Sequence, residues 1–409
     1  MSDFRKSKHI VVAGAGYAGL PALLTLARGI GKHHEEIRLT CVNPDPKQEL
    51  VCELHRTLRT GSPELFAFRD LFRNKNIEYV DGRVDELKLE SGTLSVRGEH
   101  RVEIPYDYLV LATGSKLELP PVQGLQEAID ARDTIHPRIF PFRSNTDALN
   151  LRVALRRLGW SPEARPEPFK DLFVVVMGAG STGLEVAGEI AALRGRNSRL
   201  RVVLLDSASE LLPDFSPIAR RLMKRELSQL KIETILGSPA TKLTSNEIHT
   251  ELGHVIPWDL LVLCTGSRVP RRMLEVFGPS LSPQGLDVNG DLQIKGYPGH
   301  YAVGDIAHLP QVPKRAQFAS QQGVYVAQQI LNRYLPKEDY APTGLPDYEM
   351  NDWGYLVSMG PRHGIGRLGA SSAESHIPKI LSPFLIGSAV DKAKLAAKMR
   401  YLLLLKTGL

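Results

Sequence analysis

One pattern occurs twice in this chain and constrains its fold more than any other feature. The apolar stretches HIVVAGAGYAG at 9–19 and FVVVMGAGSTG at 173–183 both run into G-x-G-x-x-G and then into a helical pattern. After a strand, such glycines allow a tight turn, close approach to a pyrophosphate and close packing of the next helix. The two sets of glycines are Gly14, Gly16 and Gly19, and Gly178, Gly180 and Gly183.

The duplication extends to the end of each repeat. Residues 102–115 read VEIPYDYLVLATGS and residues 254–267 read HVIPWDLLVLCTGS, so each repeat closes with a strand into Thr-Gly-Ser. The turn residues are Thr113 with Gly114, and Thr265 with Gly266. Repetition of a whole unit predicts a doubly wound α/β fold with two Rossmann-like dinucleotide-binding domains.

The second strand of each repeat ends at the position that normally holds a ribose hydroxyl. Asn43 lies 24 residues after the last glycine of the first motif, and Asp206 lies 23 residues after that of the second. An acid about 20 residues on usually bonds the ribose 2′-OH. Asp206 therefore favours NADH, because a carboxylate repels a 2′-phosphate. Asn43 departs from this pattern, although its amide can still bond a hydroxyl, with Asp45 or Glu49 as alternatives.

The stretch 301–323, YAVGDIAHLPQVPKRAQFASQQG, reads as a strand, a Gly304-Asp305 turn and a helix that begins near Ala316. The glycine lets the backbone approach a ligand, and the carboxylate can bind hydroxyls. The helix N-terminus would direct its partial positive charge to the same place, which suits a ring system that becomes negative when reduced. One face of this helix carries two amides four residues apart, Gln317 and Gln321.

Composition indicates a cytoplasmic globular protein. The chain is 43% hydrophobic and 23% charged, and no run approaches the length that a membrane-spanning helix requires. Strand-like sequence begins at Ile10, which leaves no room for a signal peptide. The three cysteines are too scattered for a disulfide framework, a CxxC pair or a metal site, and no metal is predicted. Three histidines show no ligand or catalytic pattern: His55, His308 and His363.

The stretch 379–409 is basic and amphipathic, with six Lys or Arg and one acid. Such a helix fits an anchor in the interface of an anionic membrane. Packing on the protein with a charged outer face, or homodimerisation, are the alternatives. Nucleic acid is not a predicted partner, although the chain carries a net charge of +6. The apolar residues at helical spacing are Ile386, Val390, Ala393, Ala397, Tyr401 and Leu405.

With these motifs the chain resembles flavoprotein reductases with two dinucleotide-binding domains, in which FAD occupies the first and NAD(P)H the second. Within that superfamily it is most similar to the type II NADH:quinone oxidoreductases, which are single-subunit and do not pump protons. AQFASQQG resembles their A-Q-x-A-x-Q-x-G segment, STGLEVAGE their [PS]-T-G-x-E-x-A-G-E segment, and the tail their G…K…RYL…K-G ending. The matching residues include Gly304, Asp305, Gln317, Gln321, Glu185, Glu189, Lys394 and Tyr401.

The resemblance implies bound FAD, NADH as substrate, and a quinone (menaquinone, ubiquinone or plastoquinone) as acceptor, at the cytoplasmic face of a membrane. Gln317 and Gln321 would line the quinone pocket, and Glu185, Lys394 and Gln321 are candidates for supplying protons. The expected domains are an FAD domain at 1–145 and 285–340, an inserted NADH domain at 146–284, and a helical membrane or dimer module at 341–409.

Two other functions are compatible with the motifs. One is an NAD(P)H-dependent reductase of a small redox protein such as a ferredoxin or rubredoxin. The other is a flavin-based redox sensor that changes its assembly with NADH. No pair of cysteines is placed to relay electrons beside a flavin, so electrons would leave directly to a quinone, a redox protein or oxygen.

Overall fold

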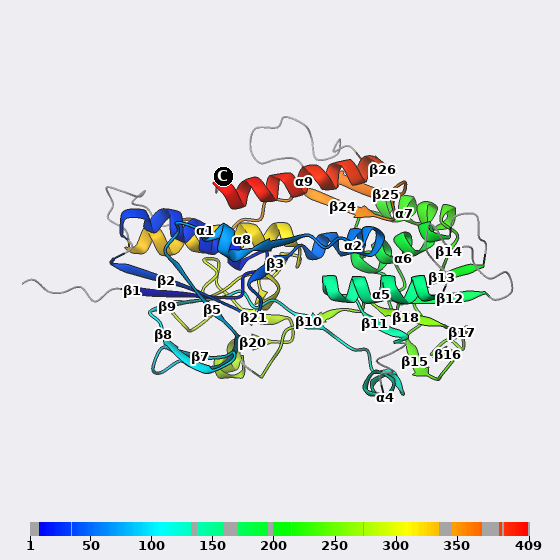
Figure 1. Ribbon diagram of the computed structural model, residues 1–409, viewed down its shortest axis with the longest axis horizontal. Coiled ribbons are helices and arrows are strands. Elements are labelled where there is room, and N and C mark those ends of the chain that lie inside the picture. The colour runs from blue at the N-terminus through cyan, green and yellow to red at the C-terminus, as the bar shows by residue number, and fades with distance from the viewer. Residues whose placement is uncertain are drawn as a thin grey trace, which may run out of the picture.

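The computed structural model describes residues 8–33, 35–131, 137–158, 171–194, 199–213, 215–272, 274–334, 345–369, 384–386 and 388–407. Two α/β halves lie side by side, each built on a parallel sheet (Figure 1). The predicted α/β class with two Rossmann-like units is therefore confirmed.

Five parallel strands form the first sheet, in the order β22-β9-β1-β2-β5. The central strand is buried from its second residue onward because it shares a core with the helices at 19–30 and 316–334 and with the strands within 83–105. The strands are β1 (Lys8–Ala13), β2 (Ile37–Asn43), β5 (Ile77–Asp81), β9 (Tyr108–Leu111) and β22 (His300–Ala302).

Helices α1 (Gly19–Ile30) and α8 (Ala316–Tyr334) pack against each other beside the first sheet (Figure 1). Two glycines allow this close approach. A Cβ atom at Gly323 would lie 2.0 Å from the carbonyl oxygen of Ala18, and one at Gly29 would lie 2.3 Å from Leu331 Cδ1. Helix α8 begins at Ala316, as predicted. Gly323 lets it pack closely against Ala18 of the first glycine motif.

The second sheet repeats the first, in the order β11-β18-β12-β13-β14, again with every pair parallel. Alternate residues of its central strand enter different cores, Val174 and Val176 on the side of α5, α6 and α7, and Val175 and Met177 on the other. The elements are β11 (Ile139–Pro141), β12 (Leu172–Met177), β13 (Leu200–Leu205), β14 (Ile232–Ile235), β18 (Leu260–Leu263), α5 (Asn145–Arg157), α6 (Ser181–Leu193) and α7 (Pro217–Gln229).

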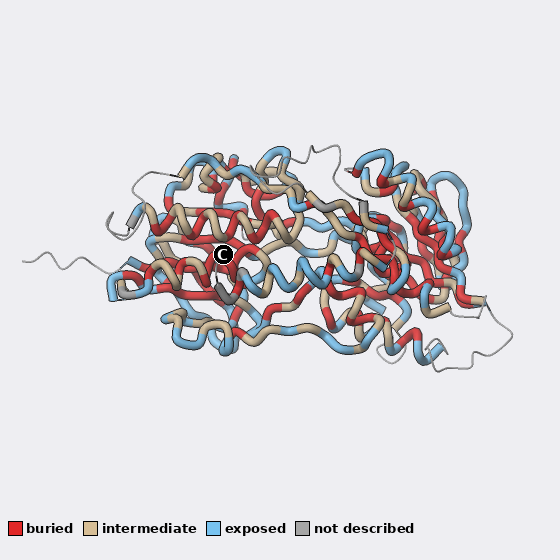
Figure 2. Tube along the Cα trace, turned by 90° about the horizontal axis from the view of Figure 1, so that it is seen from above, coloured by how far each residue is buried: buried red, intermediate tan, exposed pale blue. Residues whose placement is uncertain are grey.

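Each half also carries a three-stranded antiparallel sheet. These are β6 (Arg83–Lys88), β7 (Thr93–Arg97) and β8 (Arg101–Pro105), and β15 (Ala240–Leu243), β16 (Glu247–Thr250) and β17 (Val255–Pro257). Figure 2 shows buried residues gathered within both halves of the chain. The second half starts earlier than the expected boundary at 146, because β11 precedes that position and pairs with β18.

Two short strands join the halves where the chain passes between them. β10 (Lys116–Leu117) and β19 (Ser267–Arg268) pair antiparallel. β10 directly follows Ser115, whereas β19 begins at Ser267, the serine of its own Thr-Gly-Ser turn. The two segments that connect the halves are therefore hydrogen-bonded to each other beside the two Thr-Gly-Ser turns.

The C-terminal module contains a sheet as well as the predicted helix. β24 (Gly354–Ser358), β25 (Gly364–Leu368) and β26 (Phe384–Ile386) precede α9 (Ser388–Thr407), which runs along both halves (Figure 1). Val390 and Leu405 are buried against the protein. The apolar stripe that suggested a membrane-facing surface is therefore partly a packing surface. No helix among the described residues is long and apolar enough to cross a bilayer.

We expect Gly188→Val to separate the C-terminal sheet from α6. A Cβ atom at Gly188 would lie 2.4 Å from the Cα of Met359, just after β24. Overpacking of this kind costs about 1–3 kcal/mol, which denaturant unfolding would measure as a lower free energy of unfolding. Val153→Ala, on the exposed side of α5, is the control and should leave stability unchanged. Equal stability of both variants would contradict this packing.

Candidate functional site

A cavity of about 1930 Å³ lies between the first glycine loop, the start of α8, β24 and α9. The predicted residues that line it are Gly14, Gly16, Asn43, Thr113, Gly114, Glu185, Gly304, Asp305, Ala316, Gln317, Gln321 and Lys394. The other predicted residues do not line it: Gly19, Gly178, Gly180, Gly183, Asp206, Thr265 and Gly266. The second half contributes Ser181 and Thr182, the first two residues of α6, so the cavity reaches the edge of the second motif.

The three glycines of the first motif have different surroundings. A Cβ atom at Gly14, whose φ is +99°, would lie 2.3 Å from the carbonyl oxygen of Ala112, and one at Gly19 would lie 1.8 Å from that of Gly14. A Cβ atom at Gly16 would have no atom within 4 Å. The outer two glycines are therefore required by the protein, whereas the middle one leaves open space where a pyrophosphate would approach.

The second motif has the same arrangement. Gly178 has a φ of +108°, and its Cβ would lie 2.3 Å from the carbonyl oxygen of Cys264. A Cβ at Gly183 would lie 1.8 Å from the carbonyl oxygen of Gly178, while one at Gly180 would again have no atom within 4 Å. Both loops thus fit a dinucleotide by the same test.

Asn43 and Asp206 each hold the glycine loop of their own half. Asn43 Oδ1 accepts a hydrogen bond from the backbone N–H of Ala15 at 2.9 Å. The Asp206 carboxylate accepts from the backbone N–H of Ala179 and, at 2.7 Å, from that of Ala208. The departure at Asn43 therefore keeps the acceptor that fixes the loop and removes only the charge.

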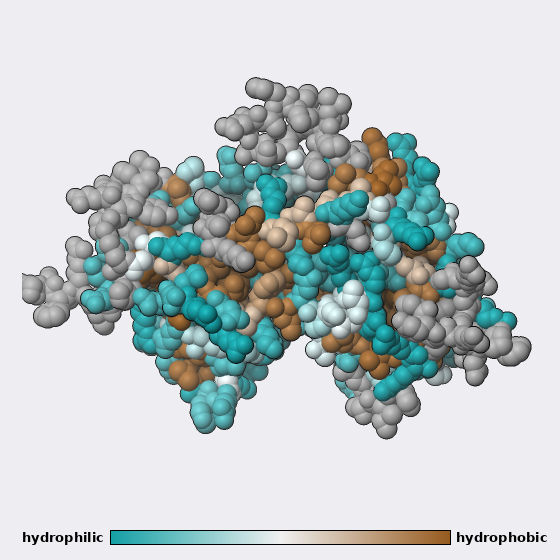
Figure 3. All heavy atoms as spheres, turned by 45° about the horizontal axis from the view of Figure 1, so that its top comes forward, coloured by the Kyte–Doolittle hydropathy of each residue, from teal (hydrophilic) through white to brown (hydrophobic). Residues whose placement is uncertain are grey.

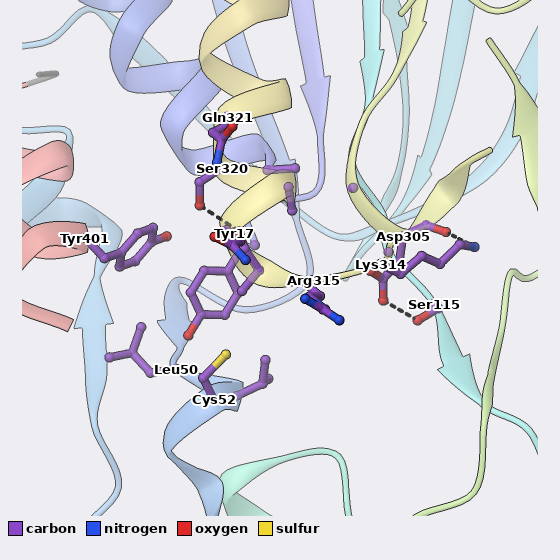
Figure 4. A pocket seen from close by; sticks show the side chains of 18 of the residues that line it. Tyr17, Leu50, Cys52, Ser115, Asp305, Lys314, Arg315, Ser320, Gln321 and Tyr401 are labelled. Atoms are coloured by element: carbon purple, nitrogen blue, oxygen red, sulfur yellow. Dashed lines mark hydrogen bonds between the residues drawn. The ribbon is translucent and has the colours of Figure 1, made fainter. Parts of the chain in front are cut away.

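The Gly304-Asp305 turn is tied to the strand end of the first repeat. Ser115 Oγ donates to Asp305 Oδ2 at 2.7 Å, and Lys314 Nζ donates to the backbone oxygen of Asp305 at 2.6 Å (Figure 4). The φ of Gly304 is +73°, and its N–H donates to Gln322 Oε1 at 2.7 Å. Burial lowers the pKa of Lys314. Ser115 and Lys314 were not predicted as site residues, although both adjoin predicted motifs.

The amides of Gln317 and Gln321 line the cavity but bond to the chain before β24. Gln317 Nε2 donates to the backbone oxygen of Gly354 at 2.9 Å, and its Oε1 accepts from the N–H of Trp353 at 2.9 Å. Gln321 exchanges two hydrogen bonds of 2.8 Å with the backbone of Asn351. In this arrangement the two side chains fix the 351–354 segment as a wall of the cavity.

Glu185 and Lys394, both proposed as proton carriers, form a buried ion pair in the cavity wall. Glu185 Oε1 also accepts from the backbone N–H of Ser358 at 3.2 Å. Burial raises the pKa of Glu185, and the charge of Lys394 opposes that rise. His55 Nδ1 lies 3.5 Å from Glu185 Oε2, so the absence of a partner pattern around this histidine in the sequence was misleading.

α9 reaches the first glycine loop through aromatic contact. The ring centroids of Tyr17 and Tyr401 lie 5.0 Å apart, and Tyr17 also faces Cys52 (Figure 4). Gln48 Nε2 donates to the hydroxyl of Tyr401. Burial raises the pKa of Tyr17. Tyr17 sits inside the glycine motif, and this position was the only signal in the sequence that it belongs to the site.

The family model described as pyridine nucleotide-disulphide oxidoreductase matches residues 8–323. Type II NADH:quinone oxidoreductase Ndh of Mycobacterium tuberculosis is 30% identical over 349 residues, 79% of this chain and 72% of that protein. A probable mitochondrial NADH-ubiquinone oxidoreductase of Schizosaccharomyces pombe is 30% identical over 81% of this chain, which spans 64% of that protein. Ferroptosis suppressor protein 1 of Homo sapiens is 25% identical over 88% of each chain.

Among solved structures, NDH2 from Plasmodium falciparum in complex with NADH has a TM-score of 0.76 at 16% identity, covering 95% of this chain and 94% of that one. The sulfide:quinone oxidoreductase of Aquifex aeolicus has a TM-score of 0.75 at 17% identity, covering 98% and 92%. At these identities the likeness establishes the shared fold.

We expect Gly16→Val and Gly180→Val to separate the two binding events. A Cβ atom at either position would have no atom within 4 Å, so both variants should fold, but each side chain would fill the space beside its own loop. Gly16→Val should be purified without flavin. Gly180→Val should keep its flavin and bind NADH at least about tenfold more weakly, as measured by titrating flavin bleaching. Loss of flavin in both variants, or in neither, would contradict the assignment of the two loops.

Proposed function

We propose that this chain, which belongs to the pyridine nucleotide-disulphide oxidoreductase family, is an FAD-dependent enzyme that passes two electrons from NADH to a quinone without pumping protons. The observation that carries the proposal is the single cavity that the first glycine loop, the start of α8 and the Glu185–Lys394 pair share. Bound FAD would supply hydride chemistry, and the protein supplies orientation and electrostatics.

The residues that would hold FAD come from three separated parts of the chain. The loop at Gly14 and Gly16 leaves room for a pyrophosphate, and the carboxylate of Asp305, held by Ser115, faces the same cavity. The N-terminus of α8 begins at Ala316 in the cavity wall. Its partial positive charge would stabilise negative charge that develops there.

NADH would bind at the second glycine loop and reach the cavity past Ser181 and Thr182. Asp206 supports NADH over NADPH, because its carboxylate stands at the end of β13, where it would repel a 2′-phosphate. Its two oxygens are oriented by backbone N–H groups of Ala179 and Ala208. The position of this charge is thus fixed before any ligand arrives.

The cysteines support an acceptor that takes electrons directly. Cys41 is buried in the first sheet, and Cys264 adjoins the second glycine loop. Cys52 is the only cysteine among the described residues that lines the cavity. A thiol relay needs two cysteines together. The names of the relatives add weight to a quinone, since several are NADH:quinone oxidoreductases.

We expect NADH oxidation to be fast only with a quinone, and to depend on the buried ion pair. Glu185→Gln should lower turnover with a water-soluble quinone by about 10²-fold, because general acid catalysis contributes at least that much. The variant should have a lower free energy of unfolding, because buried Lys394 loses its counter-charge, but bleaching of the flavin of the folded enzyme by NADH alone should be unchanged. Steady-state and stopped-flow absorbance would measure both rates.

The matched control for that experiment is Glu226→Gln. Glu226 is also a buried carboxyl, but it bonds His363 at 3.0 Å and does not line the cavity. Its variant should turn over like the wild type. If no quinone reoxidises the NADH-reduced wild-type flavin, the quinone assignment is wrong, and small redox proteins become the acceptors to examine.

The proposal includes attachment to a membrane surface through the outer face of α9. Leu395, Met399 and Leu403 recur every four residues and are 46%, 51% and 53% exposed. Ile386, at the end of β26, is also 46% exposed. Figure 3, which brings this side forward, shows apolar residues gathered among hydrophilic ones. Exposed cations on the same helix, such as Lys392 and Arg400, would suit anionic headgroups.

We expect the wild type to sediment with phosphatidylglycerol vesicles, and the triple variant Leu395→Ser, Met399→Ser, Leu403→Ser to remain in the supernatant. Leu252→Ser is the control, since Leu252 is 66% exposed elsewhere on the protein. If the triple variant still binds vesicles, this face is not the anchor. If the wild type is a dimer that the triple variant dissociates, without vesicle binding by either, the face joins two copies of the chain.

A further inference from the structure

His55 lies behind the ion pair that lines the cavity. It belongs to α2 (Leu54–Thr60), is 2% exposed, and places Nδ1 3.5 Å from Glu185 Oε2. The polar groups nearest to its ring are the Glu185 carboxylate and the backbone of Cys52, and neither makes a hydrogen bond of good geometry with it. Buried polar atoms are nearly always hydrogen-bonded. A buried imidazole held this loosely beside a buried carboxylate is placed to exchange a proton with it.

The three groups are arranged in order of depth. Lys394 and Glu185 line the cavity, whereas His55 does not. Glu185 touches both of the others, through Oε1 to Lys394 and through Oε2 toward His55. A quinone that fills the cavity would cover the side of the Glu185–Lys394 pair that faces the cavity. Protons that replace those taken by the quinone must then reach Glu185 from behind, where His55 stands.

Charged groups face His55 from three elements. α6 presents Glu185, α9 presents Lys394, and α2 itself presents Arg56 and Arg59. Burial, followed by the charges of Lys394, Arg59 and Arg56, lowers the pKa of His55 well below its ordinary value. The lowered pKa favours the neutral imidazole, and an imidazolium formed there would give up its proton more readily than an exposed one.

We propose that His55 is a positioning residue that exchanges a proton with Glu185 and so keeps the Glu185–Lys394 pair supplied with the proton that the acceptor takes up. This inference rests on the proposed function. Reducing a quinone to a quinol takes two electrons and two protons; NADH gives up both electrons and one proton as a hydride, so one further proton is needed. As a quinol O–H bond forms, an N–H bond of the Lys394 ammonium breaks. His55 takes a proton from the medium, the imidazolium passes it to the Glu185 carboxylate, and the resulting carboxyl reprotonates the Lys394 amine, which restores the ion pair and the neutral imidazole.

The test compares His55→Gln and His55→Leu with the wild type. Leucine needs no hydrogen-bond partner, so this variant should fold even where glutamine is not tolerated. His9→Gln is the control, because His9 is also buried but bonds Thr40 at 2.8 Å in the first sheet. Stopped-flow absorbance would follow flavin reduction by NADH, and then reoxidation of the reduced holoenzyme by a water-soluble quinone, across pH and in H₂O and D₂O.

Both His55 variants should be reduced by NADH at the wild-type rate and reoxidised at least about tenfold more slowly, with a larger solvent isotope effect and an altered pH profile. Wild-type reoxidation rates, pH profile and isotope effect in His55→Leu would overturn the relay and leave the quinone assignment intact. A wild-type enzyme that no quinone reoxidises would overturn both. A His9→Gln variant as slow as the His55 variants would overturn the assignment to this site.

Discussion

The buried contact between Glu185 and Lys394 is the interaction on which the rest of the site depends. It joins α6 of the second half to α9 of the C-terminal module, and the backbone N–H of Ser358 adds β24 to the same carboxylate. Removing one partner of a buried pair leaves an uncompensated charge, which is strongly destabilising. The pair therefore fixes how the last helix sits while it forms part of the cavity wall.

The two halves fix their glycine loops by the same hydrogen bond, and they differ in the charge of the residue that accepts it. In each, the residue at the end of the second strand accepts a hydrogen bond from the glycine loop, through the amide of Asn43 or the carboxylate of Asp206. The shape of both loops is thereby conserved within the molecule. What differs is electrostatic, since Asp206 carries a negative charge at this position and Asn43 does not.

Local patterns in the sequence predicted the repeated units well, because glycine spacing and strand periodicity act within about 25 residues. The start of α8 at Ala316 was predicted for the same reason. His55 was missed because its partner, Glu185, lies in the other repeat. The apolar stripe through Val390 and Leu405 was correctly periodic. Such periodicity predicts that the apolar face of the helix is buried, but it does not predict whether protein or lipid buries it.

Helix α9 is synthesised last, so the position of Lys394 in the chain affects when the site can form. Glu185 and Lys394 are separated by 209 positions, so a ribosome synthesises the acid, and all of both dinucleotide-binding halves, long before the base. During that interval the two sheets can form, but the carboxylate has no cation and the cavity lacks one wall. The enzyme would acquire its acceptor site last, as a separate event that follows the folding of its nucleotide-binding halves.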